Sequence, residues 1–438
     1  MESVIKLRLK IAPEQALVLD GQSRICNWAY NHLLEKSNLL KSEFIDKGNK
    51  EAGKTVYTRR GLRNLLPGLK VEYPFLKTVH SSPLKNAALR LSQVIKDYQD
   101  SLKGKRKGKA TGWPRYRKWS QSYFSLLYEE PGKGFKISGK CLTISCGVNQ
   151  EGKRIRVSGE LEKSLKAFPE AEIRNLRITK SHGVYYGIFT VKRPLRKQER
   201  VEKTICLDPN HKNLAYGVDN NGKALEIKNP WFLKVRQRRI DYLKSRRDKC
   251  LRKSKLITQE HGKSYWLPSR RWSFFHQKLE NEYRKRQEQT KSYLYSICHY
   301  LCRNYNLISV GDYTPRGGGI NKGMRRSMNN ESLIGRFKLT LSWVAQRSGR
   351  VSGEWVERDS TKTCNKCGFK HEKSLSPMIR RWFCPECGED HIRDENAALN
   401  GLKQVLQKYQ IPGSGHPSPT VVERWALRFN GVGLVLST

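Results

Sequence analysis

The sequence predicts a multidomain α+β protein in which an antiparallel β-barrel with a helical insert precedes an α/β domain that carries a four-cysteine ribbon. Three observations predict this order: amphipathic helical stretches followed by short alternating runs, a later succession of buried strands and long basic helices, and two Cys-x2-Cys pairs near the end. The chain has 438 residues with a hydrophobic content of 37%, which supports buried cores in roughly two to four domains.

The first half opens with a run at 4–11 in which apolar and basic side chains alternate, so it predicts a strand with one buried and one cationic face. Pro13 suits a first helical turn, and helices are expected at about 14–39 and 83–102. From 120 to 191, short alternating runs separated by turns predict a small antiparallel barrel that includes the first strand.

The second half reads as a mixed α/β domain with an interrupted C-terminal part. Its predicted elements are a buried strand at 204–208, two strands within 213–228, basic helices at 230–254 and 270–304, a strand at 307–310, a glycine-rich basic loop to about 330, a helix at 332–347, a strand at 351–357, and a helix at 394–408. Residues 411–438 look like a linker followed by a poorly specified tail.

Charge restricts the partners. There are 85 Lys and Arg residues against 40 Asp and Glu residues, a formal net charge of +45, and such a chain repels itself unless a polyanion neutralises it. The basic residues run through the whole length, which predicts that several domains line one nucleic-acid path, although charge alone also fits a histone-like or ribosome-associated binder. No stretch reaches the roughly 20 apolar residues of a membrane helix, and the N-terminus lacks a secretory pattern, so we expect an intracellular, soluble protein.

Two pairs of cysteines predict a metal site. Cys364 and Cys367 form one Cys-x2-Cys knuckle, Cys384 and Cys387 form the other, and a glycine follows each knuckle. Two thiolates from each of two tight turns make the tetrahedral sulfur cage that zinc favours, and a closed cage leaves no open position for catalysis. We therefore expect a structural zinc ion. The remaining seven cysteines are interpreted as small buried hydrophobes.

Two acidic residues stand out in so basic a chain. Asp208 ends the buried strand and is followed by Pro209, and Asp394 opens a helix directly after the ribbon. Hydrolysis of phosphodiesters by metal ions needs several carboxylates that converge on one or two Mg²⁺ ions. Taken alone, Asp208 could equally form a turn and Asp394 could cap a helix.

Together, these motifs resemble a known family. The run from Leu207 to Ala215, the two knuckles and the run from Arg393 to Asn400 are similar to TnpB proteins and to their eukaryotic relatives, the Fanzors, which are compact kin of the type V CRISPR effectors. The segment Gly112–Arg117 also resembles their barrel domain. The resemblance implies a transposon-associated, Mg²⁺-dependent DNA endonuclease that is guided by an RNA and cuts complementary DNA next to a short target-adjacent motif.

The resemblance also implies a domain plan and partners. One protein is expected to carry one guide RNA and to engage target DNA, in the nucleus of a eukaryotic host or in the cytoplasm of a bacterium. The implied domains are a wedge-like β-barrel (1–12 and 104–200), a helical recognition insert (13–103), a RuvC-like domain of the ribonuclease-H type (201–359 and 391–410), a zinc ribbon (360–390) and a tail (411–438).

One position departs from the family pattern. The middle nuclease motif normally ends an apolar strand with glutamate, whereas Gly311 stands here, and the adjacent Asp312 points to the opposite face of a strand. Glu357, at the end of the next strand, resembles the relocated glutamate of Fanzors and of some TnpB proteins. The resemblance then gives Asp208, Glu357 and Asp394 as catalytic residues that hold two Mg²⁺ ions, with Glu354 and Asp359 as rivals for the third position.

Alternatives remain open at this stage. If Glu357 is an ordinary surface acid, the protein is a nuclease-dead, RNA-guided repressor; a guide-independent zinc-ribbon protein that assists transposition is a third possibility. Aromatic and basic residues alternate before the barrel, and they could stack on RNA or pack in a core. The residues expected to bind nucleic acid are Lys105, Arg106, Lys107, Trp113, Arg115, Tyr116 and Arg117.

Overall fold

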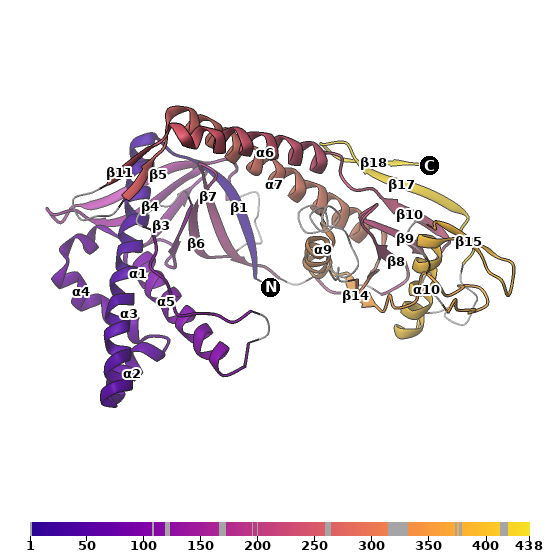
Figure 1. The fold of residues 1–438 in the computed structure, drawn as a ribbon, viewed down its shortest axis with the longest axis horizontal. Coiled ribbons are helices and arrows are strands. Elements are labelled where there is room, and N and C mark those ends of the chain that lie inside the picture. Colours follow the sequence, from indigo (N-terminus) through magenta and orange to yellow (C-terminus); the bar gives the residue numbers. More distant parts are fainter. Residues whose placement is uncertain are drawn as a thin grey trace. The chain divides into compact units, whose positions relative to one another are not determined.

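The computed structural model divides the chain into two compact units, residues 1–194 and residues 195–438, which are described separately (Figure 1). No helix within the described residues has both the length and the apolar character needed to cross a membrane. The structure describes residues 2–106, 109–118, 123–165, 172–194, 196–198, 200–258, 264–313, 332–372, 375, 379–411 and 419–438.

The first unit is built on a seven-stranded antiparallel sheet. The strands follow the order β2-β6-β7-β1-β5-β4-β3, so the first strand of the chain lies in the middle. Along β1 every second residue is buried, as the alternation of the sequence predicts. The strands are β1 (Glu2–Lys10), β2 (Phe124–Tyr128), β3 (Phe135–Ser138), β4 (Cys141–Val148), β5 (Arg154–Leu161), β6 (Glu172–Ser181) and β7 (Val184–Lys192).

Helices fill the interval between β1 and β2. The first begins at Pro13, whose fixed φ suits a first turn, and it ends at Gly48, which adopts the left-handed conformation with φ 65°. The helices are α1 (Pro13–Lys47), α2 (Lys50–Tyr57), α3 (Gly61–Asn64), α4 (Leu66–Glu72), the 3-10 helix η1 (Pro74–Thr78) and α5 (Ser81–Leu102).

The predicted barrel is an open half-barrel. Strands β2 and β3 are the two edges of the sheet, and they do not pair with each other in the described part of the chain. The reason lies in the packing: apolar residues of α1 and α5 share one core with the inward-facing residues of the strands. Leu33 of α1 and Leu91 of α5 are fully buried there. The helices therefore cover the apolar face that closure of a barrel would otherwise cover.

The second unit contains a mixed seven-stranded sheet in the order β14-β13-β8-β9-β10-β17-β18. Strands β8, β9 and β10 pair antiparallel, whereas β13 runs parallel to β8, and β14 runs parallel to β13. The strands are β8 (Thr204–Pro209), β9 (Ala215–Asp219), β10 (Lys223–Ile227), β13 (Leu307–Gly311), β14 (Val351–Trp355), β17 (Glu423–Phe429) and β18 (Leu434–Ser437).

Helices pack against both faces of this sheet. Residues of α7 and α9 share a core with Ile205 and Leu207 of β8, whereas residues of α10 share a core with Cys206, which lies between them and points to the other face. The remaining elements of the unit are α6 (Phe232–Lys249), the 3-10 helix η3 (Cys250–Lys253), α7 (Arg270–Asn304), α9 (Ile334–Ser348), α10 (Arg393–Lys408), the hairpin of β11 (Lys255–Thr258) and β12 (Ser264–Leu267), and the short pair β15 (Arg381–Phe383) and β16 (Asp390–Ile392).

The C-terminal residues, which the sequence analysis leaves as a tail, differ from that expectation. Strand β17 pairs parallel with β10, and β18 pairs antiparallel with β17, so both extend the sheet. Arg424 of β17 forms two hydrogen bonds of 2.9 Å with the carboxylate of Glu395 on α10, and the hydroxyl of Tyr216 donates to the same carboxylate. The last segment thus fixes the start of α10.

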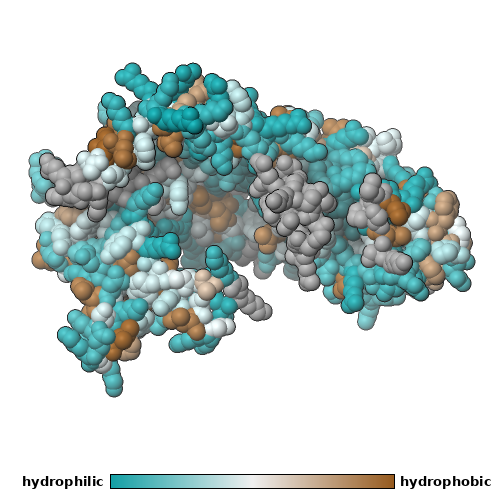
Figure 2. Space-filling model, viewed as in Figure 1, coloured by the Kyte–Doolittle hydropathy of each residue, from teal (hydrophilic) through white to brown (hydrophobic). Residues whose placement is uncertain are grey.

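The visible surface agrees with the composition. On the face drawn in Figure 2, hydrophilic residues predominate among the coloured atoms, and apolar residues form small separate patches. A surface of this kind fits the formal net charge of +45.

Replacing Arg424 should destabilise the second unit. The side chain of Glu395 is only 10% exposed. Arg424→Ala removes the cationic partner of this largely buried carboxylate, which then keeps the hydrogen bond from the hydroxyl of Tyr216. We expect the free energy of unfolding to fall by about 1–3 kcal/mol, measured by urea denaturation of the full chain. Arg428→Ala, an exposed arginine on the same strand, is the control and should change little. Equal losses in both variants would contradict this role of Arg424.

Candidate active site and metal-binding ribbon

The predicted acidic residues come from elements that meet at one edge of the second sheet. Asp208 lies in β8 and is 6% exposed, and Glu357 follows β14 by two residues. Because β8, β13 and β14 are parallel, their carboxyl ends point to the same edge. Asp394 lies in the first turn of α10, whose N-cap position belongs to Ile392, so Asp394 is not the helix cap. Its charge is favourable beside the helix N-terminus.

Glu357 occupies the space that a side chain at position 311 would need. A Cβ atom built on Gly311 would lie 1.7 Å from Oε1 of Glu357 and 2.4 Å from its carboxyl carbon. Such distances are far inside van der Waals contact, so only glycine permits this position of the carboxylate. The glycine that departs from the family pattern and the glutamate on the neighbouring strand are therefore two halves of one arrangement.

Two hydrogen bonds brace the turn that carries Glu357. The backbone N–H of Asp312 donates to the carbonyl of Trp355 at 2.9 Å, and the backbone N–H of Glu357 donates to Oδ1 of Asp312 at 3.1 Å. The indole N–H of Trp355 donates to the carbonyl of Leu207 at 3.1 Å. Asp312 thus binds the backbone of Glu357, while Trp355 ties the end of β14 to the strand of Asp208.

The electrostatics favour a cation at this edge. Burial raises the pKa of Asp208 well above its usual value, and the nearby charges of Glu357 and Asp394 raise it further. Burial raises the pKa of Glu357 to about 7; Lys338 opposes this shift and Asp312 adds to it. Oε1 of Glu357 is buried and has no hydrogen-bond partner within the part of the chain that the structure describes. Crowded carboxylates with an unsatisfied oxygen fit the donor set that Mg²⁺ prefers.

Two polar residues near Asp394 were not predicted from the sequence. Nη1 of Arg380 lies 3.5 Å from Oδ1 of Asp394, and Nδ2 of Asn210 lies 3.5 Å from Oδ2. Asn210 follows Asp208 by two residues, so its place in the same motif was an available signal. Arg380 belongs to the segment between the two knuckles, and nothing in the sequence marks it among many basic residues.

The rivals of Glu357 are engaged elsewhere. Glu354 pairs with Lys338 at 3.2 Å, and its side chain is 64% exposed. Asp359 pairs with Lys370 at 2.6 Å and with Lys362 at 3.5 Å. Strand β14 ends at Trp355, so Asp359 does not continue its alternation. Both acids are neutralised by lysines, whereas Glu357 contributes to the charge around Asp208.

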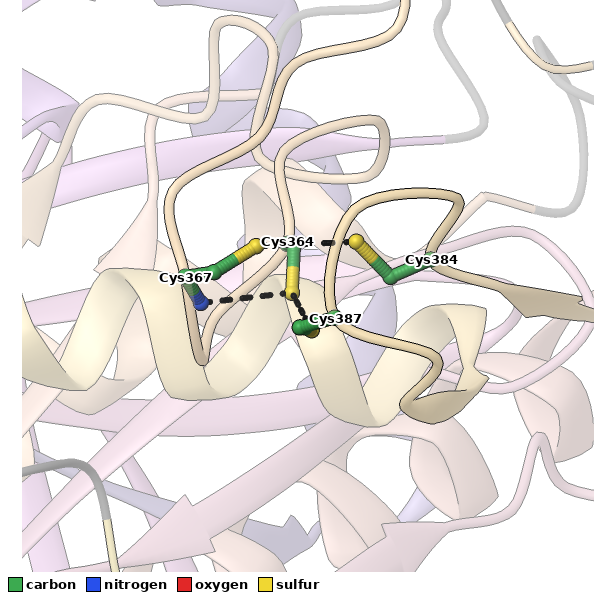
Figure 3. A group of neighbouring side chains, drawn as sticks. All are labelled: Cys364, Cys367, Cys384 and Cys387. Atoms are coloured by element: carbon green, nitrogen blue, oxygen red, sulfur yellow. Dashed lines mark hydrogen bonds between the residues drawn. The ribbon is translucent and has the colours of Figure 1, made fainter.

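The four predicted cysteines converge as a metal site. Within the described residues their sulfur atoms form the group whose ligand atoms all lie within 4.8 Å of one another (Figure 3). The Sγ atoms of Cys364 and Cys387 are 3.7 Å apart, and those of Cys367 and Cys384 are 3.5 Å apart. A tetrahedral zinc ion with Zn–S distances of about 2.3 Å separates its sulfurs by about 3.8 Å, so the arrangement fits such an ion.

The two knuckles have the same backbone design. The N–H of Gly368 donates to the carbonyl of Cys364, and the N–H of Gly388 donates to the carbonyl of Cys384. Both glycines have a positive φ, 81° and 68°, which a residue with a side chain rarely adopts. The spacing of cysteine and glycine thus dictates the turn that directs both sulfurs of a knuckle to one point.

Residues outside the knuckles hold the ribbon in place. Nε2 of His391 lies 3.1 Å from Sγ of Cys364, which suits an N–H donor to a thiolate. On α10, the side chains of Asn396 and Asn400 both donate to the carbonyl oxygens of Ser360 and Thr363. The helix that presents Asp394 is therefore bonded to the loop that presents Cys364. Apart from the proximity of the two motifs along the chain, no sequence pattern predicts this coupling.

The residues predicted to bind nucleic acid have different surroundings. Trp113 packs at the edge of the core, its indole N–H donates to Asn38 at 2.8 Å, and the ammonium of Lys41 lies 4.2 Å from its ring. Arg115 and Tyr116 are exposed. Lys105 is exposed, whereas Arg106 pairs with Asp97 at 3.6 Å. The guanidinium of Arg117 lies 3.6 Å from the centre of the Tyr30 ring. Lys107 and the basic loop from Gly317 to Met328 lie outside the described residues.

A mixed sheet with acids at one edge and a four-cysteine cluster define an α/β protein with a candidate metal site. Comparisons with known proteins show what this chain is similar to. A family model described as the Cas12f1-like TNB domain matches residues 335–401, which include α9, both knuckles and the start of α10. A Mycobacterium tuberculosis protein that is provisionally named an RNA-guided DNA endonuclease is 23% identical over 352 residues, which cover 77% of this chain and 70% of that protein.

Two further similarities point the same way. A TnpB-like protein of Acanthamoeba polyphaga mimivirus is 26% identical over 149 residues, covering 33% of this chain and 28% of that protein. A solved Cas12f1–sgRNA–target DNA complex contains a chain with a TM-score of 0.54 and 12% identity, over 91% of this chain and 98% of that one, which shows a shared fold. The chain is thus similar to proteins named as RNA-guided DNA endonucleases and as TnpB-like proteins, and it shares its fold with a chain of the solved Cas12f1 complex.

Loss of a knuckle cysteine should remove the bound metal. Because all four sulfurs converge, the purified protein should hold about one metal ion per chain in this cage, and Cys367→Ser should lose it. Elemental analysis of the purified variants measures this. Cys141→Ser, an exposed cysteine outside the cluster, is the control and should keep the metal. Full retention of metal in Cys367→Ser would contradict the site.

Proposed function

We propose that this protein is an RNA-guided DNA endonuclease associated with a transposable element, and that it hydrolyses DNA complementary to its guide next to a short target-adjacent motif. One observation carries the nuclease part: Asp208 is buried beside Glu357, whose carboxylate reaches across Gly311 and keeps a buried oxygen without a partner. A decayed site has little reason to preserve this fit. The names of the relatives, which include an RNA-guided DNA endonuclease and a TnpB-like protein, support the guided part.

The topology of the second unit supports a RuvC-like domain of the ribonuclease-H type. Three antiparallel strands (β8, β9 and β10) are followed by two strands (β13 and β14) that add in parallel on the other side of β8. This arrangement presents the ends of β8, β13 and β14 together, and α10 crosses the sheet close to them because Gly401 leaves room for Trp355. In this proposal residues 360–390 are a zinc ribbon inserted before α10, and the zinc ion is structural.

Asp208, Glu357 and Asp394 are the residues that would hold Mg²⁺. Within the described residues their carboxylates do not come as close together as the four cysteine sulfurs. When bound, Mg²⁺ ions supply a nucleophilic water and stabilise the charge of an in-line displacement. Products with a 5′-phosphate and a 3′-hydroxyl are expected.

The other residues of the site orient these ligands. Asp312 holds the backbone of Glu357, and Trp355 fixes the distance between the strand ends. Arg380 lies beside Asp394 with its side chain 44% exposed, so its guanidinium can also contact a phosphate of the bound strand. Basic residues thus position the nucleic acid, while the buried carboxylates provide the site of hydrolysis.

The first unit is proposed to bind the guide RNA as the wedge-like sheet with its recognition helices. Lys105, Arg115 and Tyr116 have the exposure that contacts with RNA need, whereas Trp113 is held by Asn38 and serves packing at least in part. Contacts of basic residues with phosphates supply most of the affinity for nucleic acid. Binding and cleavage are therefore separable properties of this chain.

Replacing a proposed Mg²⁺ ligand should abolish cleavage without loss of binding. Asp208→Ala and Glu357→Ala should each lower Mg²⁺-dependent cleavage of a guide-matched DNA by roughly 10³-fold or more, because ligation of the metal is worth several kcal/mol in the transition state. Gel analysis of cleavage and filter binding of the target measure the two properties. Glu354→Ala, which alters an acid paired with Lys338, is the matched control and should cut normally.

The same assay separates the alternatives. A wild-type complex that binds its guided target in Mg²⁺ and never cuts it would make the protein a guided repressor and would overturn the role of Glu357. Tight DNA binding by a protein that carries no discrete RNA would overturn the guided function as a whole.

An exchange between positions 311 and 357 tests the shared space directly. Gly311→Ala should abolish cleavage although alanine has no charge, because its Cβ would displace the carboxylate of Glu357. In the background of Glu357→Ala, Gly311→Glu should restore part of the activity, since the new carboxylate starts from the space that Glu357 has vacated. Cleavage rates of the three variants are compared with target binding as the control. A folded, DNA-binding double variant as inactive as Glu357→Ala would contradict the shared space.

A further inference from the structure

The first unit contains a cationic pocket that the cleavage site does not use. It is an open pocket of about 350 Å³ lined by residues of α1, α5 and β2 together with Arg117 and Tyr123. This volume falls within the range of about 300–1,000 Å³ in which proteins bind small molecules. Its walls include Asn27, Asn86, Arg90, Arg117, Tyr123 and Ser125.

Positive charge accumulates at the pocket without compensation. Burial lowers the pKa of Arg90, and repulsion from Arg177 and Arg117 lowers it further. Burial likewise lowers the pKa of Arg117. No ion pair within the described residues joins Arg90 or Arg117 to a carboxylate; Glu129 acts only on Arg177. Half-buried guanidinium groups that repel one another are unfavourable until an anion joins them.

The neutral contacts of these arginines hold them in position. Nη2 of Arg90 and Nη1 of Arg177 both donate to Oγ of Ser125, at 3.3 Å and 3.0 Å. The guanidinium of Arg117 lies 3.6 Å from the centre of the Tyr30 ring. The side-chain amide of Asn31 accepts from the backbone N–H of Arg117 and donates to the backbone carbonyl of Arg117. These bonds fix donor groups around an open space, as a preorganised anion site requires.

We propose that this pocket binds one nucleotide of the guide RNA, with its phosphate between Arg90 and Arg117. The assignment to the guide rests on the proposed function. A guide stays bound while target DNA comes and goes, so a permanent anion is the partner that best stabilises half-buried arginines. Asn86 places an amide group on the wall, where it suits a ribose 2′-hydroxyl, whereas the amide nitrogen of Asn27 already donates to the carbonyl of Lys118 at 3.2 Å. Tyr123 is 66% exposed at the pocket, where a base can stack.

The test compares two charge removals on the same helix. Arg90→Gln removes a charge in the pocket, and Lys96→Gln removes an exposed charge from α5. The probe is the RNA that copurifies with the wild-type protein, stripped and rebound at several salt concentrations; DNA of the same sequence is the second probe. We expect Arg90→Gln to weaken RNA binding about tenfold or more and to flatten its salt dependence, while Lys96→Gln has a much smaller effect and DNA binding changes little.

Other results overturn the proposal. Equal losses of RNA binding in the two variants would show that Arg90 acts only through its general positive charge. An equal loss of DNA binding in Arg90→Gln would assign the pocket to a DNA phosphate. A lower melting temperature of RNA-free Arg90→Gln together with lost binding would make Arg90 structural, whereas the proposal predicts no decrease, because the substitution relieves repulsion. If no discrete RNA copurifies with the protein, the proposed guided function is wrong. The pocket is then tested by the binding of a single-stranded RNA of mixed sequence to the same variants, which does not depend on cleavage activity.

Discussion

The exclusion of volume between Gly311 and Glu357 is the constraint on which the proposed active site depends. One carboxylate lies where any side chain at position 311 would begin, so the glycine and the glutamate can change only together. The parallel pairing of β13 with β14 makes this possible, because it ends the two strands side by side. Asp312 binds the backbone N–H of Glu357 and so holds the turn that carries this glutamate. The indole N–H of Trp355 donates to the carbonyl of Leu207 on β8, the strand that also carries Asp208. The position of one side chain thus links three strands.

A second chain of contacts couples this edge to the metal ribbon. Asn396 and Asn400 of α10 hold the loop that leads to Cys364, and Glu395 in the first turn binds Arg424 of the last strand pair. The helix therefore connects the cysteine cage, the C-terminal strands and the acid at its own N-terminus. A metal ion held by the four cysteines would order the start of α10, because the cage would fix the loop to which the helix is bonded.

The sequence predicts what depends on local spacing and fails where the partner is distant. Two residues between cysteines, a glycine after each knuckle, and alternation along β1 each determine a structure within a few residues, so the cluster and the strand were predictable. The resemblance to a known family connects Gly311 with Glu357, but their sharing of one space follows from the packing of two neighbouring strands, which no sequence pattern shows. The strands of 423–437 were missed because β17 pairs with β10, 200 residues earlier, and no local signal records that pairing. The open edge of the barrel also depends on tertiary packing, since α1 and α5 cover the apolar face of the sheet, and the pattern within each helix does not show which surface it covers.

Uncompensated charge of both signs is what remains after the fold is complete. In the second unit Asp208 and Glu357 repel each other at a buried edge, and in the first unit Arg90 and Arg117 repel each other around a pocket. Each arrangement costs stability in the free protein, since like charges are held together in a poorly solvated place. Folding alone gives no reason to keep either. In the proposals made above, cations compensate the carboxylates of the second unit and a phosphate compensates the arginines of the first unit. The proposed function, in which RNA is held before DNA is cut, requires both kinds of ligand.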